Sequence, residues 1–278
     1  MATPLPNLEE MLEAGMHFGH KSFRWHPNMA PFIFGEREGV HIIDLVRTQE
    51  CLKRALDFIN QLVSKGGVIL FVGTKKQLAL TIQQAAEDAL MPYVVSRWPG
   101  GMLTNFRTVL RSLRRLSRLE EMLRNPYATK KEKRSWQKKK KLLEADFAGF
   151  INLTELPNAL FVADLIKEKT AVAEARKLGI PIIGIVDTNA NPVLVDYPIP
   201  ANDDATSSVA LIAQTISRAV QTVRKKAKAE AAPVSSEEKE DAFVEDELLE
   251  QPEAMKAEGA GGDRGETEKA KRIKSKER

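Results

Sequence analysis

The sequence predicts an α/β fold: a parallel sheet covered by helices on both faces, with a protruding basic helical hairpin and a disordered C-terminal tail. Three observations lead to this prediction. Short apolar runs without polar alternation are separated by segments of helical periodicity, which is typical of buried parallel strands joined by helices. The segment 106–150 carries two narrow apolar seams in a basic sequence. Residues 231–278 are highly charged and nearly free of aromatic side chains.

The elements of the sheet domain follow one another along residues 1–230. Asn7 with Glu10 three residues later is a capping-box pattern, which predicts a short N-terminal helix. Apolar runs predict buried strands of the parallel sheet at 40–44, 68–72, 93–96, 159–164 and 182–187. Helical windows are expected at about 48–64, 75–90, 166–178 and 206–226. We expect right-handed crossovers between the parallel strands.

The insert 106–150 predicts a helical hairpin. Its first half has an apolar seam of three–four spacing, broken at Glu120, through Phe106, Val109, Leu113, Leu116 and Leu123. Asn125 and Pro126 end this helix, and Thr129 with Glu132 is a second capping-box pattern. The seam resumes at Trp136, Leu143, Phe147 and Phe150. A stripe this narrow cannot build its own core, so we expect two antiparallel helices that project from the sheet domain.

Residues 231–278 are predicted to form a disordered tail. They contain fourteen acids and nine bases, a net charge of −5, and Phe243 is their only aromatic residue. We interpret them as a solvated tail, with an interaction tail as the alternative. The chain is therefore expected to consist of an α/β domain, 1–230, that includes the hairpin, and the tail 231–278.

The composition excludes several classes of protein. With Cys51 as the only cysteine, no intrachain disulfide framework is possible. No apolar run approaches the roughly 20 residues of a membrane span. The N-terminus is acidic and lacks the basic and apolar regions of a secretory signal. We expect a cytoplasmic protein without a membrane partner.

The positive charge of the chain is concentrated in one segment. Residues 97–141 contain fifteen Lys/Arg and three Asp/Glu, a local charge of +12, whereas the whole chain carries +4. The remainder therefore sums to −8. An acidic chain with all its excess positive charge in one segment is expected to bind a polyanion, and nucleic acid is the first candidate.

Cations lie next to aromatic side chains at two places, where they can contact phosphates while the rings stack on exposed bases. The first place contains Lys21, Arg24 and Trp25, and the second contains Arg97, Trp98, Asn105 and Arg107. On the hairpin, the candidate contacts are Arg111, Arg114, Arg115, Arg118, Lys138 and Lys139. Neither a zinc finger nor a basic zipper is present in the sequence, so backbone-dominated binding to structured RNA is favoured over base-specific reading of DNA.

The turn Trp98-Pro99-Gly100-Gly101 joins the strand at 93–96 to the hairpin. Proline fixes its φ angle and glycine permits positive φ, so the chain can turn sharply here. We expect this turn to aim Arg97 and Trp98 outward.

The signals for catalysis are weak. Gly73-Thr74-Lys75 resembles part of a phosphate loop, but the glycine-rich turn that would surround the phosphates is missing. His17 and His20 do not have the regular ligand spacing of a zinc site. With no nucleophile or general base evident, we expect no enzyme activity and no cofactor.

Four acids form a separate group: Asp164, Asp187, Asp203 and Asp204. Asp164 and Asp187 end predicted parallel strands, where open α/β sheets place ligand sites. Converging carboxylates could hold a hard cation such as Mg²⁺. We favour the alternative that these acids cap helices and form turns, and we assign no metal site.

Seven stretches of the sequence resemble the family of ribosomal small-subunit protein number two, of the bacterial and organellar type. They are LEAGMHFGH (12–20), RWHPNMAPFIFGEREGVHIIDLVRT (24–48), GGVILFVGTKKQ (66–77), RWPGGMLTNF (97–106), LPNALFVAD (156–164), EARKLGIPIIGIVDTN (174–189) and IPANDDA (199–205). They follow the order of the family over roughly residues 8–226. RWPGGMLTNF and FGEREGVHIIDL are highly specific motifs.

The resemblance implies a flavodoxin-like sheet domain with a protruding hairpin, and a structural rather than enzymatic role. It implies docking on small-subunit rRNA between the head and the body of the subunit. Other small-subunit ribosomal proteins are implied as partners, including the large mRNA-binding protein numbered one, which members of the family help to recruit. Motif by motif, it implies rRNA contacts for Lys21, Arg24, Trp25, Arg97, Trp98, Asn105 and Arg107.

Two turns depart from the family's usual pattern. Ala148-Gly149-Phe150 stands where a Gly-Gly-Ile type of junction is common, and Leu156-Pro157-Asn158 replaces the usual LPD. Two other functions remain open at this point. One is an α/β enzyme that acts on a phosphorylated or nucleotide substrate, and the other is an RNA-binding regulator outside the ribosome.

Overall fold

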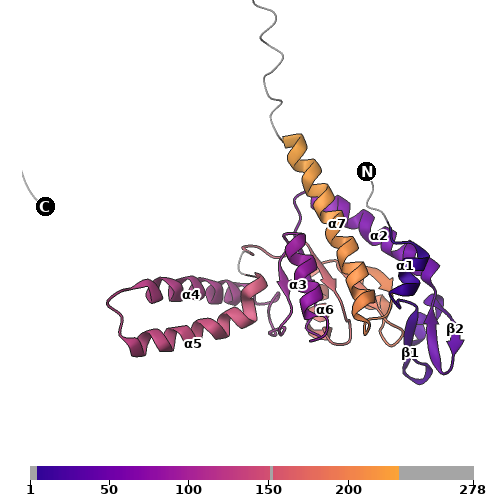
Figure 1. Cartoon of the computed structure of the whole chain (residues 1–278), viewed down its shortest axis with the longest axis horizontal. Coiled ribbons are helices and arrows are strands. Elements are labelled where there is room, and N and C mark those ends of the chain that lie inside the picture. The colour runs from indigo at the N-terminus through magenta and orange to yellow at the C-terminus, as the bar shows by residue number, and fades with distance from the viewer. Residues whose placement is uncertain (1–4, 151–152, 232–278) are drawn as a thin grey trace, which may run out of the picture. The chain divides into compact units, whose positions relative to one another are not determined.

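The computed structural model describes residues 5–150 and 153–231. The described part contains a five-stranded parallel sheet, a three-stranded antiparallel sheet and a long helical hairpin (Figure 1). The predicted tail, from residue 232 onward, lies outside the described residues.

The parallel sheet is built from five short strands. They are β4 (Ile69–Val72), β5 (Tyr93–Val94), β6 (Ala159–Val162), β7 (Ile182–Val186) and β8 (Tyr197–Pro200). Their spatial order is β5-β4-β6-β7-β8, with every neighbouring pair parallel. The first strand therefore lies between the second and the third, which is the flavodoxin-like strand order. This confirms the predicted fold class.

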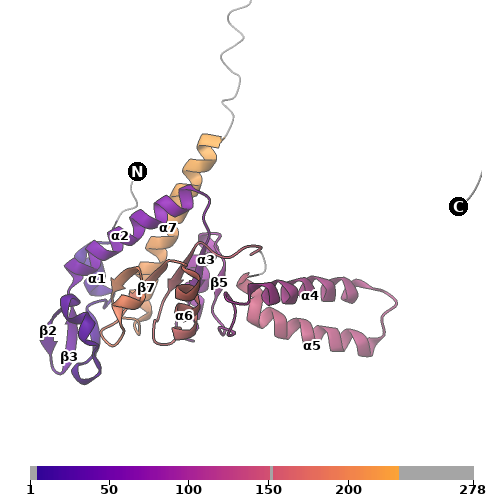
Figure 2. The ribbon, with the colours of Figure 1, turned by 180° about the vertical axis from the view of Figure 1, so that it is seen from behind.

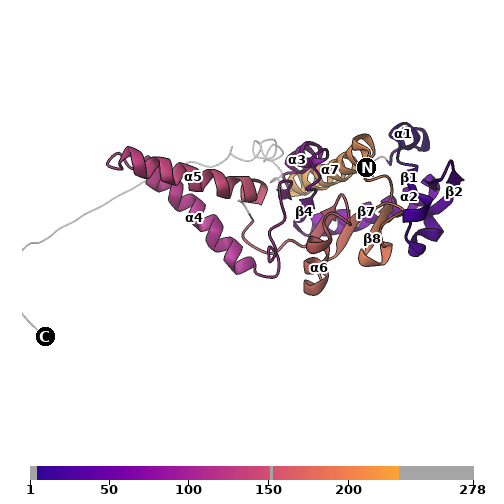
Figure 3. The same ribbon diagram turned by 90° about the horizontal axis from the view of Figure 1, so that it is seen from below.

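Helices cover both faces of the parallel sheet, because side chains along each strand alternate between the faces. Ile69 and Phe71 of β4 pack on one side, in a core with α2 (Leu45–Ser64), α3 (Ala79–Asp88) and α7 (Thr206–Ala231). Leu70 and Val72 pack on the other side, with α6 (Lys169–Leu178) and the base of the hairpin. Figure 3 shows α3 and α7 on one side of the sheet and α6 on the other.

The N-terminal segment forms its own structure, and here the prediction for 40–44 was wrong in one respect. After the short helix α1 (Leu8–Glu13) come β1 (Phe18–Lys21), β2 (Ile33–Arg37) and β3 (Val40–Ile43). Residues 40–43 do form a strand, but β3 pairs antiparallel with β1 and β2 instead of joining the parallel sheet. The cause is the two-residue turn at Glu38 and Gly39, where both φ angles are positive. Such a turn joins β2 and β3 as a tight hairpin.

Strand β8 was not predicted, because Pro198 and Pro200 interrupt its apolar pattern. Proline cannot donate a hydrogen bond to a ladder, so it is confined largely to edge strands. In agreement, β8 lies at the edge of the sheet beside β7.

Gly19 allows the antiparallel sheet to lie against the carboxyl end of β7. The His20 N–H donates to Thr188 Oγ1 at 2.8 Å, and the His26 N–H donates to Thr188 O at 2.7 Å. A Cβ atom at Gly19 would come within 2.6 Å of Thr188 Cγ2. The close approach therefore requires glycine, and it brings His20 to the strand ends of the parallel sheet.

The two departures from the family pattern fit the structure. A Cβ atom at Gly149 would overlap the Tyr93 ring and its carbonyl oxygen, so the remaining glycine of this junction is the one that the packing needs. The Val68 N–H donates to Asn158 Oδ1 at 2.8 Å. An aspartate oxygen could accept the same bond, so asparagine preserves this turn.

Candidate nucleic-acid interface

The hairpin consists of α4 (Phe106–Arg124) and α5 (Lys130–Phe147), which lie side by side and project from the sheet (Figures 1 and 2). The predicted capping box at its tip is present. The Glu132 N–H donates to Thr129 Oγ1 at 3.3 Å, and the Thr129 N–H donates to Glu132 Oε2 at 3.0 Å. These reciprocal bonds start α5 and set the direction in which the chain returns.

The apolar seam holds the two helices together. Val109, Leu113, Leu116 and Leu119 of α4 are buried. The predicted break at Glu120 was wrong, because the seam passes through Leu119 one position earlier. Glu120 is only partly buried and binds Lys140 of α5, with 3.0 Å between Lys140 Nζ and Glu120 Oε1.

The cations predicted on the hairpin are all exposed: Arg107, Arg111, Arg114, Arg115, Arg118, Lys138 and Lys139. Lys140 is partly buried and also bridges to Glu144, with 3.2 Å between Lys140 Nζ and Glu144 Oε1. Among the described side chains, no carboxylate lies within ion-pair distance of the exposed set. These positive charges are therefore accessible to an external anion.

At the base of the hairpin, the structure corrects the expected orientation of Trp98. Arg97 and Asn105 are exposed as expected, but the Trp98 side chain is only 8% exposed. Its indole Nε1–H donates to Glu174 Oε1 at 3.2 Å. The ring packs with residues of the core between the sheet and the hairpin, including Met102 and Val109. Trp98 therefore fixes the turn instead of offering a stacking surface.

Glu174 of α6 also fixes the turn that leads from the sheet into the hairpin. Its carboxylate accepts hydrogen bonds from the N–H groups of Gly101, Leu103 and Thr104, at 2.7, 2.9 and 3.0 Å. Burial alone would raise the pKa of Glu174, but these backbone hydrogen bonds lower it below its ordinary value. The ionised carboxylate thus links the sheet domain to the start of the hairpin.

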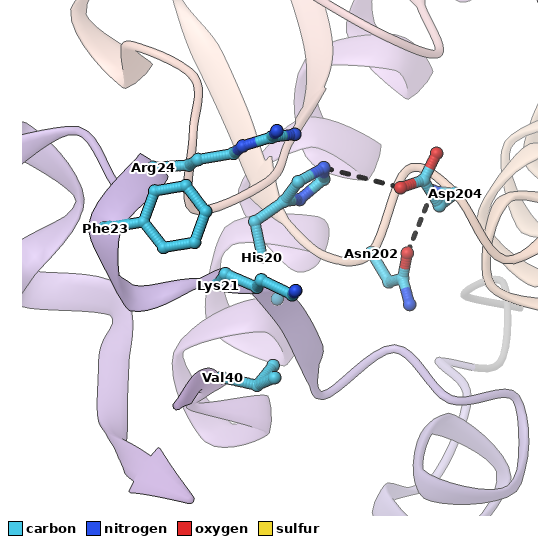
Figure 4. A pocket seen from close by; sticks show the side chains of 8 residues that line it. His20, Lys21, Phe23, Arg24, Val40, Asn202 and Asp204 are labelled. Atoms are coloured by element: carbon cyan, nitrogen blue, oxygen red, sulfur yellow. Dashed lines mark hydrogen bonds and ion pairs between the residues drawn. The ribbon is translucent and has the colours of Figure 1, made fainter. Parts of the chain in front are cut away.

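The N-terminal cluster lies at the end of β1 and in the 3-10 turn η1 (Ser22–Arg24) that follows it, far along the chain from the hairpin. Lys21, Arg24 and Trp25 are exposed, as is Phe23. The Arg24 guanidinium lies 5.4 Å from the centre of the Phe23 ring, and Trp25 packs against His41. Figure 4 shows a hollow of about 380 Å³ that Lys21, Phe23 and Arg24 line together with Asp204. The side chains form an exposed surface of cations and flat rings.

Three of the four acids at the strand ends converge on a cation of the chain itself, Lys75. Its Nζ lies 3.0 Å from Asp164 Oδ2, 3.2 Å from Asp203 Oδ1 and 2.7 Å from Asp204 Oδ1. Asp187 pairs with His20 instead, with 3.1 Å between Asp187 Oδ2 and His20 Nδ1. Burial and the nearby charges of Asp164 and Asp187 raise the pKa of Asp203 to about 7.

Turn formation explains part of this cluster, because residues 165–168 form a turn and α6 begins only at Lys169. Asp164 Oδ1 accepts hydrogen bonds from the N–H groups of Ile166 and Lys167. Before α7, which begins at Thr206, Asn202 forms the corresponding turn, because its Oδ1 accepts from the N–H groups of Asp204 and Ala205. Asp203 and Asp204 serve mainly as partners of Lys75.

The faint phosphate-loop signal has a structural explanation. Thr74 follows β4, and its N–H donates to Glu168 Oε1 at 2.7 Å. The Glu168 carboxylate is 2% exposed and thus lies where a phosphate loop would need space for an anion. Lys75 is turned toward the acids. The chain therefore uses this strand end for internal contacts.

Sequence reasoning missed the roles of Lys75 and Glu174. Each binds groups roughly 70 to 130 residues away in the chain. The one signal present in the sequence was the excess of acids at strand ends, which indicates a nearby cation without identifying it.

No helix among residues 5–150 and 153–231 is long and apolar enough to cross a membrane.

Comparison with known proteins gives one consistent result. The family model described as ribosomal protein S2 matches residues 11–223. The chain is 46% identical to small ribosomal subunit protein uS2 of Helicobacter hepaticus over 248 residues, which cover 86% of this chain and 94% of that protein. It is 43% identical to the protein of that name from Cytophaga hutchinsonii over 246 residues, which cover 86% and 97% of the two chains.

A third relative, small ribosomal subunit protein uS2 of Acidothermus cellulolyticus, is 49% identical over 217 residues, which cover 77% of this chain and 79% of the relative. The matched region includes both sheets and the whole hairpin. The predicted resemblance is thereby confirmed, and with it the prediction of a ribosomal protein rather than an enzyme. The chain belongs to the ribosomal protein S2 family.

Proposed function

We propose that this protein is a structural constituent of the small ribosomal subunit that binds rRNA mainly through its hairpin. The observation that carries the proposal is the set of exposed cations on α4 and α5, which lack carboxylate partners among the described side chains. Like charges three and four residues apart on a helix repel one another. A nucleic acid backbone relieves this repulsion and releases its own counterions on binding.

The N-terminal cluster supplies a second contact with rRNA in this proposal. Lys21 and Arg24 offer charges for phosphates, and the exposed faces of Phe23 and Trp25 can stack on unpaired bases. Arg97, Asn105 and Arg107 lie at the base of the hairpin and contribute further polar contacts. Two separated contacts suit a protein that bridges the head and the body of the subunit. The site of action is the cytoplasmic ribosome.

A protein partner is also part of the proposal: the large mRNA-binding protein numbered one of the small subunit. An apolar patch on α1, β2 and the start of α2 supports this role. Its members Leu8, Leu12, Phe34 and Val46 are 42, 56, 80 and 53% exposed. They border a hollow of about 390 Å³. An apolar surface of this kind, apart from the cationic hairpin, suits a protein rather than RNA.

Replacing Leu12 and Phe34 by Ser tests the partner. We expect purified subunits to retain less of the large mRNA-binding protein, with rRNA binding unchanged. Equal retention by wild type and variant would contradict this part of the proposal.

The rRNA proposal is tested by titrating the full chain with small-subunit rRNA at several salt concentrations. For the wild type, log affinity should fall steeply and linearly with log salt. Replacing Arg111, Arg114, Arg115 and Arg118 by Gln should reduce the slope by about 3, since each phosphate that a cation neutralises contributes about 0.7 to 0.9 to the slope.

A matched control removes four exposed cations from α2 and its end, Arg47, Lys53, Arg54 and Lys65. This control should keep the wild-type slope. Equal slopes for the wild type and the hairpin variant would contradict the proposal, and so would an equally large reduction of the slope in the control.

A further inference from the structure

One edge of the hairpin forms a groove between α4 and α5, with a volume of about 820 Å³. Its cationic lining residues are Arg111, Arg114, Arg115 and Arg118 of α4 and Lys139 of α5. Its apolar lining residues are Leu119, Met122 and Trp136. None of these eight described residues is acidic. We call this set the arginine groove.

The other edge of the hairpin carries an ion-pair network. There Lys140 of α5 lies between Glu120 of α4 and Glu144, at 3.0 and 3.2 Å. The contact with Glu120 joins the two helices, and the one ammonium charge is paired with two carboxylates. The hairpin is therefore not uniformly basic: one edge carries a row of unneutralised arginines, and the other carries an internal ion-pair network.

The spacing of the arginines makes the groove electrostatically unfavourable without a ligand. Arg111, Arg114, Arg115 and Arg118 lie at i, i+3, i+4 and i+7 of one helix, so neighbouring guanidinium groups repel. Among the described side chains no carboxylate pairs with them. A row of anionic groups in the groove would remove this repulsion.

The apolar residues that line the groove indicate which kind of anion it binds. Trp136 was predicted only as a seam residue, but its ring is partly exposed and lines the groove beside Met122. A duplex presents phosphates to a protein helix and hides its bases, so it has little use for an indole surface. An unpaired base can stack on Trp136, while the adjacent phosphates reach the guanidinium groups.

We propose that the arginine groove binds a single-stranded segment of RNA, with its phosphates on the arginine rim and a base stacked on Trp136. This inference rests on the proposed function, because it specifies which part of the hairpin the rRNA occupies and in which form. It adds Trp136 to the contact residues.

The first experiment locates the phosphate contacts, with the full chain and an oligoadenylate as the probe. The groove variant R115Q/R118Q should lower the slope of log affinity against log salt by about 1.4, since each neutralised phosphate of a single strand contributes about 0.7. The control R124Q/K141Q removes two exposed cations that do not line the groove. It should keep the wild-type slope. Equal reductions in both variants would overturn the groove as the site, because binding would then be spread over the hairpin.

The second experiment separates stacking from packing at Trp136. W136L keeps an apolar residue in the seam but removes the ring, and W136F keeps a smaller ring. We expect W136L to bind the oligoadenylate about tenfold more weakly, as for the loss of one stacked base. W136F should retain most of the affinity, and both variants should bind a duplex of equal phosphate number as the wild type does. Equal losses in W136L and W136F, or no loss in W136L, would overturn the stacking contact.

A third measurement distinguishes RNA from an acidic peptide. Polyglutamate of the same net charge should displace the oligoadenylate poorly from the wild type. From W136L, polyglutamate should displace it more readily. Displacement by polyglutamate at equal charge concentration would overturn the assignment to RNA.

If the wild type fails to bind rRNA at all, the proposed function fails. If replacing Arg111, Arg114, Arg115 and Arg118 lowers the salt slope for rRNA but W136L binds the oligoadenylate as the wild type does, only the present inference fails.

Discussion

The sheet domain and the hairpin use charged side chains in opposite ways. In the sheet domain, the charges at the strand ends are paired within the chain: Lys75 with Asp164, Asp203 and Asp204, and Asp187 with His20. On the hairpin, most cations are exposed, and only Lys140 is paired among the described side chains. Charges of the first kind stabilise the fold, and charges of the second kind are accessible to a partner. Mutations in the two regions should therefore have different consequences.

The largest effect on stability is expected for Lys75→Met. Removing the ammonium leaves the carboxylates of Asp164 and Asp203, both mostly buried, without a cation. Breaking such a partly buried pair should lower the free energy of unfolding by about 3 kcal/mol. Urea denaturation measures this change. R118M on the hairpin is the matched control and should change the free energy by less than about 0.5 kcal/mol. Similar losses in both variants would contradict the contrast between the two regions.

Glu174→Ala should have the next largest effect, because it removes the acceptor of the hairpin turn. The N–H groups of Gly101, Leu103 and Thr104 then lose their partner. We expect a loss of about 2 kcal/mol in the free energy of unfolding, since buried donors without acceptors are costly. Hydrogen exchange should accelerate at these three amides and stay slow in β6. Unchanged exchange at the turn would show that Glu174 does not hold it.

A pH-dependent effect of comparable size is expected for Asp203→Asn. The pKa of Asp203 is raised from 3.8 to about 7, so the folded state holds this proton more tightly than the unfolded state does. Its contribution to stability is therefore present below about pH 4 and is lost as the pH rises toward 7. Between pH 5 and pH 8, the variant should gain about 2 kcal/mol relative to the wild type.

Thermal unfolding of Asp203→Asn across this pH range provides the measurement. D57N, at an exposed position of α2, is the control and should follow the wild type. A constant difference between D203N and the wild type at all pH values would contradict the raised pKa.

The smallest effect is expected at the tip of the hairpin. Thr129→Ala removes the side-chain acceptor of the Glu132 N–H at the start of α5. Loss of such a cap costs about 1 kcal/mol of helix stability. Local hydrogen exchange in the first turn of α5 should accelerate, with β4 and β6 unaffected. Faster exchange in the sheet as well would mean that the hairpin and the sheet domain unfold as one unit.

The sequence predicted most elements because their signals are local. The apolar runs at 68–72 and 182–187 and the seam with Val109 and Leu113 depend on neighbours a few residues apart. Strand β8 was not found, since Pro198 and Pro200 disrupt its pattern and only its edge position makes them acceptable. The strand at 40–43 was found, but its membership in a separate sheet depends on the turn at Glu38 and Gly39.

The candidate site was predicted unevenly for the same reason. Exposure of Arg111 and Arg118 follows from helical periodicity, so it could be predicted. The burial of Trp98 depends on Glu174, which lies 76 residues further along the chain. No local pattern reveals that pairing. The arginine groove likewise requires Trp136 and Arg115 to meet across two helices, and only the structure brings them together.

The most direct test of the central claim is photocrosslinking within assembled small subunits. One crosslinking side chain replaces Arg118 on the hairpin, and in a second protein it replaces Lys53 on α2, where both native residues are exposed. We expect the label at 118 to crosslink to rRNA and the label at 53 to give little rRNA product. Equal yields, or a higher yield from position 53, would contradict the hairpin as the RNA-binding arm of this protein.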